Sequence, residues 1–129
     1  MTTVLFVVTA ADVWTLSDGT LHPTGYWAEE LAEPHRLFSE VGWEITVATP
    51  NGKAPTLDRL SLGVAGGSKD KRRWIDAYLE LISDRLNHPV PLDQIDDTQY
   101  DLLCHAPAAI LAARNWPSRN CALDRDSPP

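Results

Sequence analysis

A continuous run of apolar residues from Val4 to Val8 constrains the fold of this chain more than any other segment. The run is rich in β-branched residues. A strand with this pattern is buried on both faces, and such strands belong to parallel sheets that helices cover. We therefore expect an α/β protein whose N-terminal strand lies inside the sheet.

The remaining segments alternate between strand and helix patterns. Three strands are predicted at 4–8, 43–48 and 100–103, and three helices at 26–41, 68–86 and 106–113. Ser68 is the expected N-cap of the second helix, and Gly42 the C-terminal cap of the first. Pro34 either kinks the first helix or begins another one. A loop with a turn at Asp18-Gly19 is expected between residues 9 and 25. This order predicts a parallel sheet with right-handed crossovers.

Length and charge narrow the range of functions. The 129 residues are enough for one domain, and the net charge of −7 argues against nucleic acid or an anionic membrane surface as a partner. The basic cluster at 69–73 leads into a helix and is expected to be its solvated face. No apolar stretch is long enough for a signal peptide or a membrane span. With only two cysteines, a reducing cytoplasm is the expected location.

Cys104 is the first candidate for chemistry, because it follows a predicted strand and precedes a predicted helix. A turn at that point would expose the thiol at the C-terminal edge of the sheet, and the helix N-terminus would stabilise a thiolate. His105 follows directly, but adjacent residues on a turn diverge. The pattern alone favours a buried structural cysteine over a nucleophile, because such cysteines are common in cores.

Glu30 is the second candidate. It lies among apolar residues of the first predicted helix, where partial burial would raise the pKa of its carboxyl group and suit it to proton transfer. The spacing alone favours the simpler interpretation, in which Glu29, Glu30 and Glu33 form the solvent-exposed face of a helix.

Metal and phosphate sites have little support. The histidines are His22, His35, His88 and His105, and no two of them have the spacing of metal ligands. The glycine-rich segment 63–68 lacks the ending of a phosphate-binding loop. We predict no metal and no cofactor.

Two segments, in this order, resemble the ThiJ/PfpI (class I glutamine amidotransferase-like) superfamily, in particular its heat-shock chaperones with glyoxalase III activity. The first begins with the apolar strand and includes TGYWAEELAEP at 24–34 and ATPNG at 48–52; the second is CHAPAA at 104–109. Together they cover about residues 4 to 114. Residues 1–114 are expected to form the domain, and residues 115–129 a disordered tail.

The resemblance implies a flavodoxin-like parallel sheet with helices on both faces, and a homodimer, since the family is often dimeric. It makes Cys104 the nucleophile, His105 its neighbour in the motif, and Glu30 the partner of the thiol. Similar enzymes convert small aldehydes such as methylglyoxal to lactate without a cofactor, and some are described as deglycases or holding chaperones.

The chain also departs from the family pattern. In similar proteins a strand like 100–103 continues into a Gly-Gly-His-Gly turn, a helix and another strand before the cysteine motif, whereas here Cys104 follows Leu103 directly. The missing turn is expected to supply backbone N–H groups that stabilise an oxyanion, so an impaired site is predicted. The alternatives are a non-catalytic or holding module, and an amidase or peptidase, although no downstream histidine is available as a general base.

Overall fold

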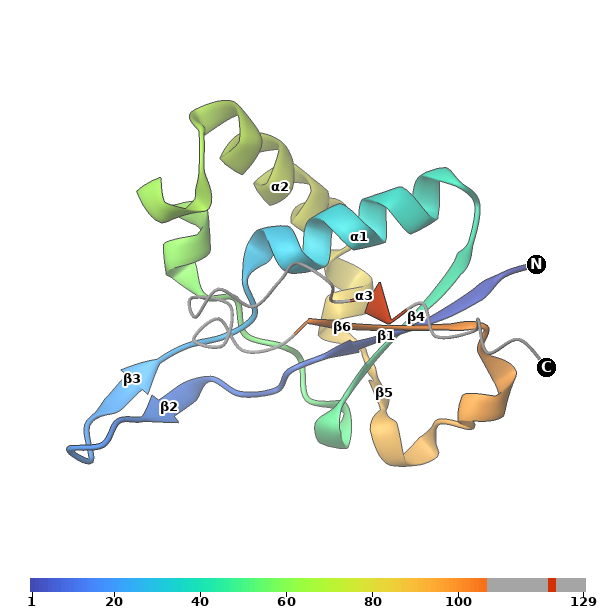
Figure 1. Cartoon of the computed structure of the whole chain (residues 1–129), viewed down its shortest axis with the longest axis horizontal. Coiled ribbons are helices and arrows are strands. Elements are labelled where there is room, and N and C mark those ends of the chain that lie inside the picture. The colour runs from blue at the N-terminus through green and yellow to red at the C-terminus, as the bar shows by residue number, and fades with distance from the viewer. Residues whose placement is uncertain (107–120, 123–129) are drawn as a thin grey trace.

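The N-terminal strand β1 (Thr3–Val8) lies inside the sheet, as its apolar sequence predicts. The computed structural model describes residues 1–106 and 121–122, and Figure 1 shows the chain. Four parallel strands are present: β1, β4 (Glu44–Thr49), β5 (Val90–Pro91) and β6 (Leu102–Ala106). The order in the sheet is β5-β4-β1-β6, and β7 (Cys121–Ala122) adds an antiparallel pair outside β6. The predicted α/β class is confirmed.

The register of β1 places its alternate residues on two different faces of the sheet. Phe6 aligns with Val47 of β4 and with Cys104 of β6, so the three side chains lie in one row on the same face. All three are buried, in the same apolar core as the helices. This row is the centre of the layer between sheet and helices.

The first predicted helix forms as α1 (Ala28–Glu40), and Pro34 lies inside it rather than at the start of another helix. Gly42 ends it with φ of 78°, a conformation that costs glycine little. The Gly42 N–H bonds to Ser39 O at 3.1 Å and the Trp43 N–H bonds to Phe38 O at 3.0 Å. The rings of Phe38 and Trp43 stack 5.4 Å apart. This is a Schellman motif with its apolar contact, and it confirms the predicted cap.

The second predicted helix forms as α2 (Lys69–Leu81) and the short α3 (Ser83–Asn87). The Ser68 hydroxyl accepts a hydrogen bond from the Lys71 N–H at 3.2 Å, which confirms the predicted N-cap. The apolar stripe of these helices packs on the sheet; its buried members are Ile75, Leu79, Ile82 and Leu86.

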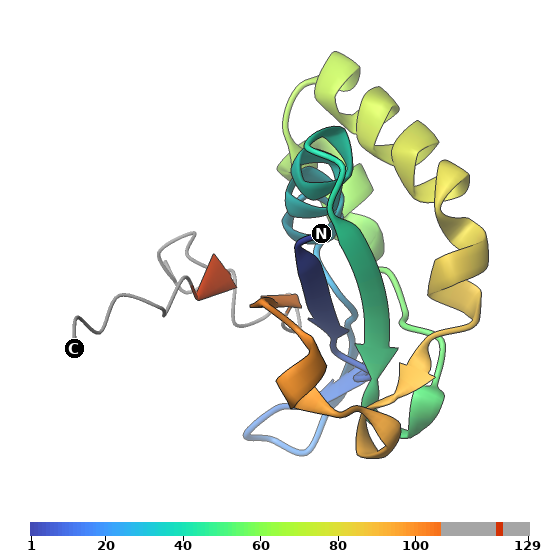
Figure 2. The ribbon, with the colours of Figure 1, turned by 90° about the vertical axis from the view of Figure 1, so that its right-hand side faces the viewer.

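The three described helices lie on one face of the sheet (Figure 2), whereas helices were expected on both faces. The connections β1–α1–β4 and β4–α2–β5 move in the same direction across the sheet, and right-handed crossovers of that kind place their helices on the same face. The chain then returns past β4 and β1 to β6 through short turns only. The predicted third helix, 106–113, lies outside the described residues except for Ala106, which belongs to β6.

The predicted loop between residues 9 and 25 contains a two-stranded antiparallel ribbon, β2 (Val13–Thr15) and β3 (Leu21–Pro23). Its tip has the expected turn: Gly19 has φ of 85°, and the Thr20 N–H bonds to the Asp18 side chain at 2.8 Å. Five short 3-10 helices complete the described elements: Pro50–Gly52, Arg59–Leu62, Val64–Gly66, Leu92–Gln94 and Asp97–Gln99.

In the range expected to be a disordered tail, Cys121 and Ala122 pair with β6, and the rest lies outside the described residues. In the part of the chain that the structure describes, no helix is long and apolar enough to cross a membrane.

Candidate functional site

The order of the strands reverses between β1 and β6, because the chain first adds strands on one side of β1 and then crosses to the other. In open α/β sheets, ligands bind outside the carboxyl ends of the strands at such a switch point. Here the two strand ends are held together: the Thr9 N–H, just after β1, bonds to Ala106 O at 3.0 Å. This edge is the candidate site.

Cys104 lies within β6, opposite Phe6, and its side chain is 0% exposed. The prediction that the strand ends at Leu103 and that Cys104 stands on a turn is wrong. The reason is the alternation along β6, in which Cys104 and Ala106 are buried while Leu103 and His105 are exposed. A small apolar thiol and a methyl group fit beside β1, so pairing continues to Ala106. The burial agrees with the structural interpretation of the cysteine; a catalytic role stays a prediction.

His105 points to the opposite face of the sheet from Cys104, because successive residues of a strand alternate. It is exposed, but the part of the ring that lies against the sheet is desolvated, which lowers the pKa of His105 from its usual 6.5. Its position excludes a direct contact between the imidazole and the Cys104 thiol in this conformation, in line with the expectation that the two side chains diverge.

Glu30 lies in the first turn of α1. Since α1 connects two parallel strands, it runs antiparallel to them, and its N-terminus comes to the carboxyl edge of the sheet. The side chain is partly buried, and its Oε2 atom is inaccessible to solvent. An acidic group in the first turn is stabilised by the helix dipole. The neighbouring Glu29 forms an ion pair with Lys71 of α2.

The segment before α1 fixes the position of Glu30. The Tyr26 N–H bonds to Thr56 O at 2.8 Å, and the Asp58 N–H bonds to Tyr26 O at 2.9 Å. A Cβ atom on Gly25 would lie 2.0 Å from Thr56 O, so only glycine fits. This close approach explains in physical terms the Thr24-Gly25 pair that the sequence analysis used only as a motif.

Two buried side chains in this segment were missed by the sequence analysis. Tyr26 is 4% exposed, and burial raises the pKa of its phenol to about 12. Thr24 is 4% exposed, and its Oγ1 atom has no hydrogen-bond partner among the described residues. Both belong to the TGYWAEELAEP segment of the resemblance, but no local pattern in the sequence indicates that their side chains are buried.

The structure therefore brings Glu30 and Cys104 to the helix-covered side of the sheet, towards its carboxyl edge, and places His105 on the other face. No group of three or more His, Cys, Asp or Glu side chains that could hold a metal ion occurs within residues 1–106.

Known structures share this architecture. The Rapid Encystment Protein 24 KDa of Francisella tularensis matches with a TM-score of 0.66 and 22% identity, over 84% of this chain and 45% of that one. Glyoxalase III from Candida albicans matches with a TM-score of 0.61 and 21% identity, over 83% of this chain and 44% of that one. No family model matches the sequence, and no curated protein matches it either.

The chain therefore has the α/β fold of these two proteins, with four parallel strands in one sheet and helices packed on it. More particularly, its structure is similar to that of glyoxalase III, which confirms the resemblance at the level of the fold. The chain spans less than half of the length of both proteins.

Proposed function

We propose that this chain processes small reactive aldehydes such as methylglyoxal, in the manner of glyoxalase III, and that it does so inefficiently because its thiol is buried. The observation that carries the proposal is the arrangement at the switch point. The first turn of α1, which carries the Glu30 carboxylate with its desolvated Oε2 atom, and the C-terminal half of β6, which carries the Cys104 thiol, both lie towards the carboxyl edge of the sheet. The similarity to glyoxalase III supports the same chemistry.

In the proposed mechanism the Cys104 thiolate attacks the aldehyde carbon of methylglyoxal. A carbon–sulfur bond forms, and the carbonyl oxygen takes up a proton to give a hemithioacetal. Glu30 then removes the proton from that carbon and returns it to the neighbouring carbon, while the hydroxyl proton of the hemithioacetal passes to the ketone oxygen; together these transfers convert the adduct into a thioester of lactic acid. Water hydrolyses the thioester, releasing lactate and the thiol, so that methylglyoxal and one water give one lactate.

Two features account for the low efficiency. An aldehyde cannot reach a side chain that is 0% exposed, so attack on Cys104 requires β6 to move away from the helices. The glycine turn expected to stabilise an oxyanion is missing, a loss worth about 3–4 kcal/mol of transition-state stabilisation when one such donor is removed.

The experiment is an assay of lactate formation from methylglyoxal by the wild-type chain, Cys104→Ala and Glu30→Gln, with Glu33→Gln as the matched carboxylate control. Slow lactate formation that both site variants abolish, and that Glu33→Gln retains, is the expected result. Equal activity in Cys104→Ala would show that the thiol is not the nucleophile.

A second candidate is a non-catalytic module with the same fold. The observation in its favour is the complete burial of Cys104 in the apolar core. It predicts no lactate above the uncatalysed rate from a chain that nevertheless shows a cooperative thermal transition by circular dichroism. An unfolded chain would exclude both candidates.

A further inference from the structure

One edge of the sheet is open over most of its length. Strand β4 pairs with β5 only through Ala48 with Val90 and Thr49 with Pro91. Residues 44–47 of β4 therefore have no strand on their outer side among the described residues. In this register the next partner, opposite Val47, would be Pro89, which has no N–H group to continue the ladder. An edge of this kind presents a row of backbone donors and acceptors that another extended segment can use.

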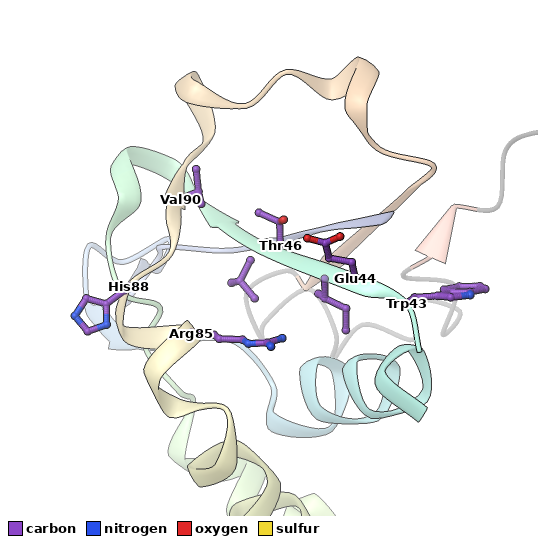
Figure 3. Close-up of a pocket in the computed structure, with 8 residues that line it drawn as sticks. Trp43, Glu44, Thr46, Arg85, His88 and Val90 are labelled. Atoms are coloured by element: carbon purple, nitrogen blue, oxygen red, sulfur yellow. The ribbon is translucent and has the colours of Figure 1, made fainter. Parts of the chain in front are cut away.

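The open edge borders a cavity rather than a flat surface. The cavity has a volume of about 390 Å³, at the lower end of the usual range for ligand pockets. Figure 3 shows its lining side chains, which come from Trp43 and β4, from Arg85 of α3, from His88 and from Val90 of β5. A bound segment would therefore contact α3 as well as the edge of β4.

The charges around the cavity favour one type of side chain. Glu44 and Thr46 project to one side of β4, and Arg85 lies on the other side, along the cavity (Figure 3). Arg85 is exposed, and no ion pair with a described residue is formed by its guanidinium group. His88 lies at the far end of the cavity, exposed and close to Asp84.

We propose that the open edge of β4 binds a short extended peptide segment by strand addition, with one Asp or Glu side chain of that segment paired with Arg85. Alternate side chains of an added strand point to the same side of the sheet, so every second side chain of that strand is on the side where Arg85 lies. The carboxylate forms a charge-assisted hydrogen bond there, and the backbone supplies the remaining bonds. A broadly acidic partner is disfavoured by the net charge of −7.

The proposal is independent of the aldehyde chemistry, since β4 and the switch point between β1 and β6 are separate parts of the sheet. Its test is fluorescence anisotropy with the labelled peptide acetyl-Thr-Val-Asp-Val-Thr-amide and the full chain. Two N-methylated forms of this peptide, methylated on alternate residues, serve as matched probes. One form blocks the N–H groups that face β4, and the other blocks only groups that face solvent. The form whose β4-facing N–H groups are methylated is expected to lose binding, and the other form is expected to keep it.

The ion pair is tested by Arg85→Gln and by the Asp-to-Asn peptide. Each change is expected to weaken binding by about tenfold, and the two together by no more than either alone, since both remove the same ion pair. Arg59→Gln, an exposed arginine outside the cavity, is the matched control and retains wild-type affinity.

Several results would overturn the proposal. They are no binding at millimolar peptide, equal binding of both N-methylated forms, and additive losses from Arg85→Gln and the Asn peptide. Sedimentation velocity provides a further check on self-association through β4. If the chain forms such a dimer and the peptide does not dissociate it, the occupant of this edge is a second copy of the chain.

Discussion

The Nδ1 atom of His35 lies 2.6 Å from the hydroxyl oxygen of Tyr78, so a partly buried hydrogen bond joins α1 to α2. His35 is 1% exposed, and its ring contacts Phe6 of β1 with the centroids 6.0 Å apart. Its Nε2 atom is buried without a hydrogen-bond partner among the described residues. One imidazole thus contacts both helices and the sheet.

The first prediction concerns the Tyr78 hydroxyl. In Tyr78→Phe the Nδ1 atom of His35 loses its short hydrogen bond, which is expected to lower the free energy of unfolding by about 1–3 kcal/mol. Denaturant titration of the variant measures the loss. Adding His35→Leu should reduce the effect of Tyr78→Phe, because the buried polar atom is then absent. Additive effects of the two substitutions would contradict a coupling between these side chains.

The second prediction concerns pH. Burial lowers the pKa of His35 from 6.5 to about 4. Above pH 6.5 the ring is neutral in both the folded and unfolded states, so it contributes no pH dependence. Between pH 6.5 and 4 the unfolded chain binds a proton that the folded chain excludes. The free energy of unfolding therefore decreases as the pH is lowered through this range, by a total of about 3 kcal/mol. Denaturant titrations at several pH values should show this slope in the wild type and in His22→Gln. The slope should be clearly smaller in His35→Leu, where the lowered pKa of His105 still contributes.

The third prediction compares two glycines. Gly25→Ala places a methyl group against the Thr56 carbonyl, which disrupts the segment that leads into α1, and should cost several kcal/mol or prevent folding. In Gly42→Ala the added methyl group meets no atom within 4 Å. The only loss in stability is the backbone strain of an alanine at a φ of 78°, about 1–2 kcal/mol. Thermal melts of the two variants measure the difference. Equal costs would show that Gly25 is not closely packed.

The fourth prediction concerns access to the thiol. In a Cys121→Ser background, a thiol reagent such as dithionitrobenzoate should modify Cys104 roughly a hundredfold more slowly in the native protein than after unfolding, because the side chain is 0% exposed. The rate should rise with low concentrations of denaturant. Immediate modification under native conditions would mean that the thiol reaches solvent without unfolding of β6, which would favour efficient catalysis.

Local signals along the chain were sufficient for most of the fold. The apolar run of β1 predicts an inner strand, Ser68 predicts a helix start, and Gly42 predicts a helix end. Each of these features acts through the residues beside it, by side-chain burial, a side-chain hydrogen bond or a permitted φ, and so can be recognised from a short stretch of sequence.

The candidate site shows the limits of such reasoning. Cys104 and its neighbours fit a turn as well as a strand, and only pairing with β1 through Val8 and Ala106 decides between them. The hydrogen bond between His35 and Tyr78 could not be predicted either, since it joins residues 43 positions apart.

By itself, the sequence determined the inner strand β1, the start of α2, the end of α1 and the parallel arrangement of the strands, and it named Cys104 and Glu30 as candidates for chemistry. The tertiary structure alone decided which face of β6 carries the thiol, that the described helices cover one side of the sheet, and that part of the β4 edge stays open. The physical reason is that caps and periodic burial are local, whereas strand register and side-chain exposure depend on contacts between distant segments.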